Sequence, residues 1–196
     1  MSEIDTQAWV LRAGPAPTAG EPRQAPRYGD AELPSDAFTL EPYSFPAPME
    51  DECLLEPLFG CWEANYAHAL RREPVDVCRQ RGEGRIVLGN CGVVRVLQAG
   101  SDVSNVKEGD VCLLHGAAVV DKRGHMVKAH AYDAPGTIGI LAKRTKAPAR
   151  QLIPLPQDNP FTLEQWAAFS LRYVTAWSNW RSLFAGECSH RIGRLG

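Results

Sequence analysis

The sequence has little net charge and no long apolar run. Its 21 Lys and Arg residues nearly balance its 23 Asp and Glu residues, giving a formal net charge of −2. A chain without a block of one sign attracts neither nucleic acid nor an anionic membrane strongly. No apolar stretch reaches membrane-spanning length, and residues 1–14 lack the basic and apolar regions of a secretory signal. We therefore expect a cytoplasmic protein with a small-molecule partner, and neither nucleic acid nor membrane as a partner.

The cysteines also lack the regular spacing that marks a disulfide scaffold. In a cytoplasmic chain, scattered cysteines predict reduced thiols, most of them in the core. A chain of 196 residues can bury the core of one domain without covalent staples. The six cysteines are Cys53, Cys61, Cys78, Cys91, Cys112 and Cys188.

The strongest strand signal lies in residues 85–116. Three apolar runs rich in β-branched residues occupy positions 85–88, 92–99 and 111–114, and glycines bound the second run. The Lys-Glu-Gly-Asp sequence at 107–110 is typical of a turn that leads into a new strand. These runs predict three strands of a small barrel.

The rest of the chain predicts further short elements. Thr162 and Gln165 stand at the spacing of a capping box, so a helix is expected to begin there. Proline and glycine crowd residues 14–35, which predicts an extended loop. Strands are expected at 9–11, 38–41, 52–56, 138–142 and 149–156, a helix at 62–70, turns at 43–48 and 133–136, and irregular structure at 116–132.

The order of these motifs resembles the medium-chain dehydrogenase/reductase family. In that family, the GroES-like catalytic domain carries a Gly-His-Glu-x-x-Gly segment, a strand, a Gly-x-x-Val turn and a Val-Gly-Asp-x-Val strand. Here Gly89, Gly92, the run at 92–99, residues 100–106 and residues 108–111 follow in the same order. The resemblance implies a mainly β fold with short helices, built as a GroES-like, partly open β-barrel.

The resemblance also implies how the chain is divided. Residues 1–160 would form the catalytic domain, and residues 161–196 a C-terminal helical segment that leads into a cofactor domain. Thr175 falls in a stretch similar to the small-residue helix start of the family and is the implied cofactor-binding residue. The sequence contains no Gly-x-Gly-x-x-Gly turn, with which a Rossmann domain holds the cofactor pyrophosphate. We expect the Rossmann domain to be absent, NADPH to serve an intact family member, and this chain alone to bind none.

Zinc-dependent members of the family hold their metal with a loop cysteine and with the His and Glu of the Gly-His-Glu segment. Cys61 matches the loop cysteine, but Asn90 stands where the histidine would be, and an amide is a poor zinc ligand. The four-cysteine structural zinc lobe of the family has no counterpart after residue 111. The resemblance therefore implies a zinc-independent protein without a bound metal.

Zinc-independent members include quinone reductases, enoyl-thioester reductases and crotonyl-CoA reductases, which deliver hydride from NADPH to an activated double bond. Such a reaction needs hydrogen-bond donors that hold the developing enolate. The candidates are Cys61, the amides of Asn65 and Asn90, the Tyr66 hydroxyl, and His68 as a proton donor. Ordinary structural roles stay open for them, such as a turn cap for Asn90 and a surface position for His68.

These expectations combine into one function and two alternatives. The chain would be the substrate-side domain of an NADPH-dependent medium-chain reductase for an unsaturated thioester or carbonyl substrate, cut short before the cofactor half. The alternatives are a non-enzymatic interaction domain and an inactive remnant. Aromatic residues near the C-terminus recur at helical spacing and predict an apolar face for self-association or for a partner, with an ordinary intradomain core as the other interpretation. They are Trp166, Phe169, Tyr173, Trp177, Trp180 and Phe184.

Overall fold

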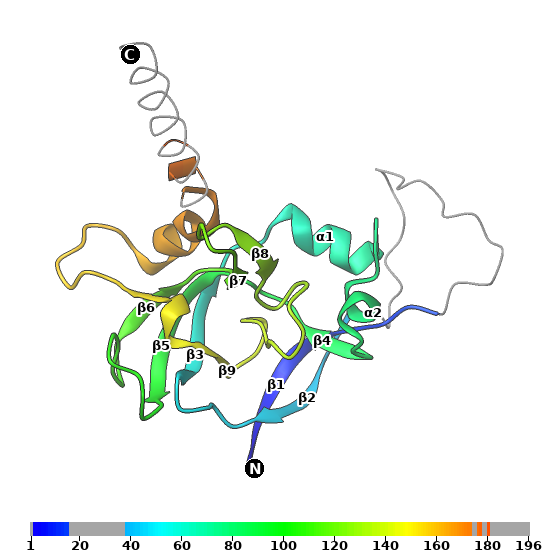
Figure 1. The fold of residues 1–196 in the computed structure, drawn as a ribbon, viewed down its shortest axis with the longest axis horizontal. Helices are drawn as coiled ribbons and strands as arrows, with labels where there is room; N and C mark the ends of the chain where they lie inside the picture. The colour runs from blue at the N-terminus through cyan, green and yellow to red at the C-terminus, as the bar shows by residue number, and fades with distance from the viewer. Residues whose placement is uncertain (1, 16–37, 174–175, 178–179, 181–196) are drawn as a thin grey trace, which may run out of the picture.

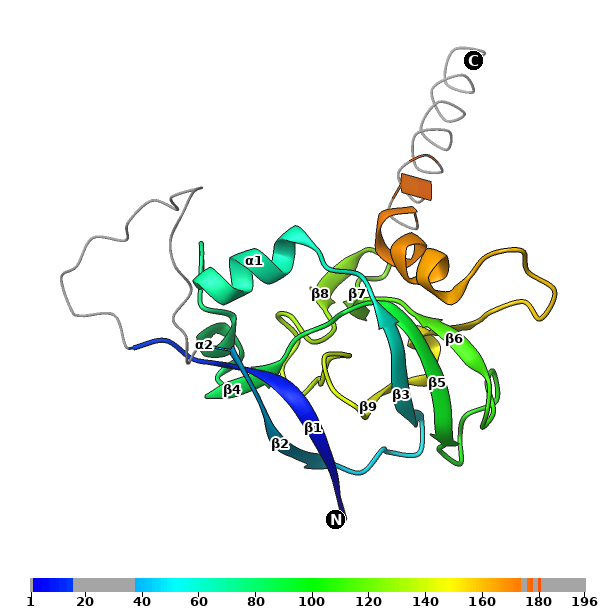
Figure 2. The same cartoon turned by 180° about the vertical axis from the view of Figure 1, so that it is seen from behind.

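The computed structural model describes residues 2–15, 38–173, 176–177 and 180. Two curved antiparallel sheets lie on either side of a shared interior (Figures 1 and 2). One sheet has the order β2-β1-β4, and the other has the order β10-β6-β5-β3-β9. The strands are β1 (Glu3–Arg12), β2 (Phe38–Pro46), β3 (Glu52–Gly60), β4 (Arg85–Val87), β5 (Gly92–Ala99), β6 (Val111–Leu114), β9 (Thr145–Pro148) and β10 (Leu152–Pro154). This confirms the predicted mainly β, partly open barrel with short helices.

The three central runs form strands at the predicted positions but do not share one sheet. β5 pairs with β6, whereas β4 pairs with β1 in the other sheet. The predicted three strands of the barrel are therefore present, and the structure adds that they are divided between the two sheets. The loop between β4 and β5 instead carries the chain from one sheet to the other.

β2 is longer than predicted, and the turn expected at residues 43–48 is wrong. Pro42 pairs with Gln7 and Pro46 with Glu3, so the strand continues through both prolines. β2 lies at the edge of its sheet, where a residue without an N–H removes no ladder hydrogen bond. The edge position thus accommodates Pro42 and Pro46 within the strand.

Residues 138–142 do not form the predicted strand. Instead, this segment inserts between the two sheets (Figure 1): the Gly139, Ile140 and Leu141 N–H groups donate to the carbonyls of residues 87–89 at 3.0–3.1 Å. On its other side the Leu141 carbonyl accepts from the Trp9 N–H at 2.8 Å. Alternating its partners between β1 and the β4–β5 loop prevents a regular ladder. The segment closes one side of the barrel. The next strand along the chain is β9, which begins only at Thr145.

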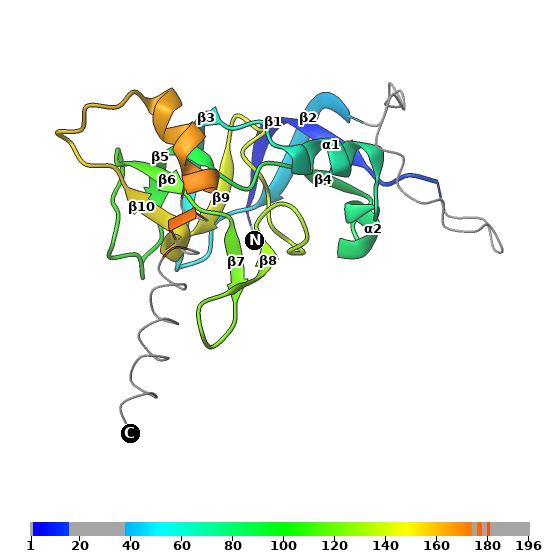
Figure 3. The ribbon, with the colours of Figure 1, turned by 90° about the horizontal axis from the view of Figure 1, so that it is seen from above.

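Residues 116–132 are not irregular as predicted, because they contain the hairpin of β7 (Ala117–Val120) and β8 (Met126–Ala129). The Asp121 carboxylate closes the hairpin by accepting hydrogen bonds from the N–H groups of Arg123 and His125. The hairpin extends away from both larger sheets (Figure 3). The polar residues of its turn are the reason why the sequence predicted irregular structure here instead of two short strands.

Short helices cover one end of the barrel. Helix α1 (Ala64–Arg71) lies close to the predicted helix, and α2 (Val77–Arg81) was not predicted. The Asp76 carboxylate caps α2 by accepting from the N–H groups of Cys78 and Arg79, a signal that was present in the sequence. The strand expected at 149–156 is only partly present, because residues 149–151 form a 3₁₀ turn before β10.

The predicted capping box at Thr162 and Gln165 is confirmed. The Gln165 side chain accepts from the Thr162 N–H at 2.9 Å, and the Thr162 hydroxyl accepts from the Gln165 N–H at 3.3 Å. The helix that follows lies beside β5 and β6 (Figure 3), and its Ala167 packs against Val93 of β5 and Leu113 of β6. This contact fixes the first turns of the C-terminal helix on the barrel.

Among the described residues, no helix has the length and apolar character needed to cross a membrane. Most of the loop predicted at 14–35 lies outside the described residues, as do Thr175, Phe184 and Cys188. All strand pairs in the described ranges are antiparallel, so those ranges contain no parallel Rossmann sheet.

Candidate functional site

A small hollow lies between α1 and the loop that joins β4 to β5. It has room for about 10 Å³, enough for a single water-sized group. Three of the candidate residues line it, contributed by two elements that are distant in sequence. Its lining residues are Asn65, Tyr66, Leu88, Gly89, Asn90, Ala131 and Tyr132.

Close backbone packing holds the loop between β4 and β5 in place. Gly89 has a φ of 115°, a conformation that side chains rarely adopt. A Cβ at Gly89 would lie only 2.7 Å from Cγ1 and 2.8 Å from the backbone nitrogen of Ile140. The position therefore requires glycine, and the inserted segment at 138–142 sets where the loop lies.

Asn90 follows Gly89 and is 8% exposed. On one side it packs against Gly116, where a Cβ would stand 3.1 Å from the Asn90 carbonyl oxygen and 3.4 Å from Nδ2. On the other side it lines the hollow. Asn90 is thus a buried residue that lies between Gly116 and the hollow rather than on an exposed turn.

Asn65 and Tyr66 lie in the first turn of α1. Tyr66 is only 4% exposed and stacks on Trp62, with ring centroids 4.7 Å apart. Burial raises the pKa of Tyr66, and the nearby Cys91, Glu63 and Cys61 raise it further. The phenol therefore stays protonated at neutral pH and can donate a hydrogen bond.

Cys61 and His68 do not line the hollow. Cys61 is half-buried in the chain between β3 and α1, where burial followed by the charge of Glu63 raises the pKa of its thiol. His68 lies three positions beyond Asn65 on α1 and does not line the hollow. Their predicted roles stay predictions, and the structure brings neither to the hollow.

The donor set near the loop does not fit a zinc ion. Within the described ranges, no group of three or more His, Cys, Asp or Glu side chains is arranged to hold a metal. Cys91 is completely buried, and burial raises the pKa of its thiol to about 12, so the thiolate that zinc requires is strongly disfavoured. Asn90 offers only an amide. The absence of zinc from the purified protein remains a prediction.

The described residues also offer no pyrophosphate cradle. No parallel strand leads through a glycine-rich turn into a helix within those ranges. Thr175, the implied cofactor residue, lies outside them.

Sequence reasoning missed Ala131 and Tyr132, which complete the hollow. They lie about 40 positions after Asn90 in a turn, and no periodic pattern links them to it. Ala131 has a φ of 53°, unusual for a residue other than glycine, and its N–H donates to the Thr137 hydroxyl at 2.7 Å. Ser170 was also missed: it lies beside Cys91 and lowers the pKa of that thiol against the larger effect of burial.

The geometry of the hollow suits one oxygen atom. Asn65, Tyr66 and Asn90, whose side chains carry neutral hydrogen-bond donors, all line this space of about 10 Å³. Neutral donors in a partly water-excluded hollow stabilise negative charge that develops on an oxygen. The hollow is far smaller than a substrate and would receive only the oxygen of one.

No protein-family model and no curated protein sequence matches the chain. Solved structures do. A 2-octenoyl-CoA carboxylase reductase in complex with NADP and 2-octenoyl-CoA matches 83% of this chain and 39% of its own, with a TM-score of 0.66 and 22% identity. A crotonyl-CoA carboxylase/reductase matches 79% of this chain and 35% of its own, with a TM-score of 0.59 and 19% identity.

A quinone oxidoreductase from Coxiella burnetii is also similar, with a TM-score of 0.53 and 15% identity over 82% of this chain and 40% of its own. The chain thus spans about 40% or less of the length of these structures. Identities of this size show the fold alone. The chain has the fold of the GroES-like domain of medium-chain reductases, the fold that its motif order predicted.

Proposed function

We propose that this chain is the substrate-side domain of an NADPH-dependent reductase that acts on an unsaturated thioester or carbonyl substrate. One observation carries the proposal: Asn65, Tyr66 and Asn90, from α1 and from the β4–β5 loop, line a single oxygen-sized hollow. The structures it resembles include a 2-octenoyl-CoA carboxylase reductase in complex with NADP and 2-octenoyl-CoA, which supports the same substrate class.

In this proposal the hollow receives the carbonyl oxygen of the substrate. Hydride addition to a conjugated double bond moves negative charge onto that oxygen, and the charge is largest near the transition state. Donors held by burial and by backbone packing need no reorganisation when the charge appears. Asn90 is the best-held of the three, since Gly116 and the loop fix its position.

The remaining predicted residues have supporting roles in the proposal. His68 would supply a proton from α1, and Cys61 would lie near the substrate path at the end of β3. Hydride would come from NADPH held by a cofactor domain, with Thr175 at its boundary. The division into residues 1–160 and 161–196 belongs to the same proposal.

The test joins this chain to a cofactor domain. Residues 1–177 are fused to the cofactor domain of the 2-octenoyl-CoA carboxylase reductase, and NADPH oxidation is followed with 2-octenoyl-CoA. We expect turnover that falls about 100-fold with Asn90→Ala, in the range lost when one donor to an oxyanion is removed. Asn105→Ala is the matched control, because Asn105 donates to the carbonyls of Ala149 and Leu152 away from the hollow.

Two results would count against the proposal. Equal activity of the Asn90→Ala and parent fusions would show that the hollow does not stabilise the oxygen. A folded fusion that binds NADPH but reduces neither 2-octenoyl-CoA nor crotonyl-CoA nor a quinone would remove the proposed substrate classes altogether.

A second candidate function, a non-enzymatic interaction domain, is favoured by the aromatic face of the C-terminal helix. Four aromatic rings there form a row in which each ring contacts the next, with ring centroids 4.9–5.7 Å apart. The rings are those of Phe161, Trp166, Phe169 and Tyr173. Trp166 packs partly on the barrel, but Tyr173 is 60% exposed. A row of ordered, exposed rings suits a protein partner.

A further inference from the structure

Two cysteines lie at facing positions where β3 ends and β5 begins. These strands lie side by side in the larger sheet (Figure 2), and the last pair of their ladder is Gly60 with Gly92. Cys61 directly follows Gly60, and Cys91 directly precedes Gly92. The two cysteines therefore occupy the next positions of the same antiparallel register.

The two glycines let the backbones of β3 and β5 approach each other closely. A Cβ at Gly92 would lie 2.3 Å from the Phe59 carbonyl oxygen and 3.2 Å from Gly60 Cα, so no side chain separates the strands here. Facing residues of an antiparallel pair have Cα atoms about 4.5–5.5 Å apart. A disulfide usually joins Cα atoms about 4.4–6.8 Å apart. The register thus gives the two cysteines a spacing that a disulfide can span.

The two thiols also share one electrostatic environment. Burial raises the pKa of Cys91, the Ser170 hydroxyl lowers it, and Glu63 and Cys61 raise it further. Burial likewise raises the pKa of Cys61, the charge of Glu63 adds to this increase, and Arg172 opposes it. The same carboxylate therefore lies near both thiols, and Cys61 lies near enough to Cys91 to affect its ionisation.

The two cysteines differ in exposure. Among the described cysteines Cys61 alone is not fully buried, so it is the thiol that an external reagent reaches. Cys91 is completely buried and can react only with a sulfur that the protein itself brings to it. A second pair, Cys53 and Cys112, is also within electrostatic reach, but both members are completely buried on strands that β5 separates. Only the pair at the end of β3 combines a facing register with an accessible thiol.

We propose that Cys61 and Cys91 form a reversible disulfide when the protein meets a small disulfide oxidant such as glutathione disulfide. Cys61 attacks one sulfur of the oxidant, which forms a mixed disulfide and releases one glutathione thiol that carries the proton of Cys61. Cys91 then attacks the Cys61 sulfur, and the second glutathione thiol leaves with the proton of Cys91. Two protein thiols lose two electrons in total, and the glutathione disulfide gains them. The facing position of Cys91 makes the second step intramolecular, which offsets its small thiolate fraction.

The disulfide joins the two elements that line the hollow. Cys61 lies shortly before α1, which carries Tyr66, and Cys91 directly follows Asn90. Burial raises the pKa of Tyr66, and Cys91 and Cys61 are among the groups that raise it further, so both thiols lie near the phenol. Oxidation therefore ties the β4–β5 loop to the start of α1 and changes the geometry of the hollow. The bond itself does not rest on the proposed reductase function.

The test uses the full chain and counts its thiols. The reduced protein is incubated with glutathione disulfide, and the remaining thiols are titrated in denaturant. We expect the count to fall by two from the six cysteines of the sequence and to return to six with dithiothreitol. Chymotrypsin cuts after Phe59, which separates Cys53 from Cys61, so mass spectrometry of the unreduced digest identifies the joined peptides. They should contain Cys61 and Cys91.

Variants separate the roles of the two cysteines. Cys91→Ser should stop the reaction at the mixed disulfide and leave one glutathione on Cys61, whereas Cys61→Ser should lose no thiol. Cys112→Ala is the matched control, because Cys112 is a buried thiol of β6 outside the pair, and it should form the disulfide as the parent does. If Cys91→Ser does not fold, alkylation of the parent replaces it: Cys61 should react with iodoacetamide at least about tenfold faster than each other described cysteine.

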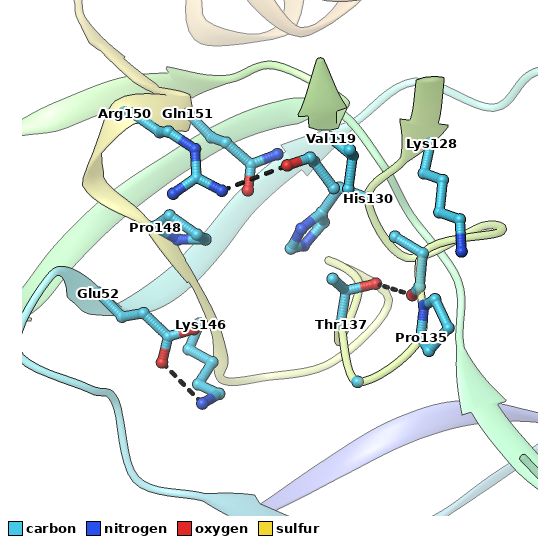
Figure 4. A pocket seen from close by; sticks show the side chains of 13 residues that line it. Glu52, Val119, Lys128, His130, Pro135, Thr137, Lys146, Pro148, Arg150 and Gln151 are labelled. Carbon is cyan, nitrogen blue, oxygen red and sulfur yellow. Dashed lines mark hydrogen bonds and ion pairs between the residues drawn. The ribbon is translucent and has the colours of Figure 1, made fainter. Parts of the chain in front are cut away.

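NMR of the reduced and oxidised chain localises the effect of the bond. The side-chain amide signals of Asn65 and Asn90 should shift on oxidation, because both residues line the hollow. The side-chain amide of Gln151 is the internal control. Figure 4 shows Gln151 at a cavity that His130 and Thr137 also line and that shares no lining residue with the hollow, so its signal should stay unchanged.

Three outcomes would overturn the proposal. An unchanged thiol count in excess glutathione disulfide would show that the two facing thiols do not meet. A disulfide that joins Cys61 to Cys188 or to a second copy of the chain would assign the reactivity to Cys61 alone. A Gln151 signal that shifts as much as those of Asn65 and Asn90 would show that oxidation disturbs the whole fold instead of the hollow.

Discussion

Acidification should destabilise this protein through His130. The side chain is 1% exposed, and burial lowers the pKa of the imidazole from 6.5 to about 4. Above about pH 6.5 the folded and unfolded chains both carry a neutral ring, so His130 contributes no pH dependence there. Between about pH 6.5 and 4 the unfolded chain binds the proton and the folded chain does not, and stability falls as the pH falls.

The two pKa values set the size of the effect. At about pH 5 the unfolded imidazole is almost wholly protonated and the folded one almost wholly neutral, which lowers the free energy of unfolding by about 2 kcal/mol relative to about pH 8. Below pH 4 the loss levels off at about 3 kcal/mol. The charged groups around the ring are Arg81, which lowers the pKa, and Glu52, which raises it, and both act less than burial.

Urea unfolding of the parent and of His130→Gln at several pH values measures this effect, because carboxylates elsewhere contribute equally to both proteins. The loss of unfolding free energy between about pH 8 and 5 should be larger in the parent than in His130→Gln by about 2 kcal/mol. An NMR titration of the parent that gives His130 a pKa near 6.5 would refute the reasoning, even if the His130→Gln variant does not fold.

Four further outcomes are expected. Metal analysis should find no stoichiometric zinc, and one zinc per chain that is lost in Cys61→Ala would show a metal site. Fluorescence titration should find no saturable binding of NADPH by this chain alone, and micromolar affinity would reveal a nucleotide site outside the described residues. Sedimentation should show self-association that Trp180→Glu weakens, and a monomeric parent would exclude it. Ile140→Ala should lower the free energy of unfolding by about 2–5 kcal/mol in a chemical unfolding curve, and a loss below about 1 kcal/mol would contradict the role of Ile140 in closing the barrel.

The sequence predicted elements whose signals are local. The run at 92–99 became β5 with the predicted bounds, because β-branched residues between two glycines specify a buried strand without help from distant residues. The capping box at Thr162 formed for the same reason, since its partner is three positions away. The order of the motifs along the chain predicted the overall fold, which no single apolar run could have indicated.

Features set by distant partners were not predictable. Residues 138–142 are as apolar as a strand, but they form hydrogen bonds with the β4–β5 loop and with β1. The sequence does not show that these two distant segments lie beside them. For the candidate site, the sequence identified Asn65 and Asn90, which share the hollow, as possible donors, and Asn90 also through its place in the motif order. It could not show that Tyr132 lies beside them or that Cys61 and His68 lie outside.

The fit of Gly89 and Gly92 against Ile140 also affects the order in which the chain can fold during synthesis. A side chain at Gly92 would lie 2.6 Å from Ile140 Cδ1, so the loop that carries Asn90 takes its shape around a residue made about 50 positions later. As the protein leaves the ribosome, β1 to β6 can emerge while the loop still lacks its support. A nascent chain that stalls before residue 138 would therefore expose an unformed site to chaperones and proteases.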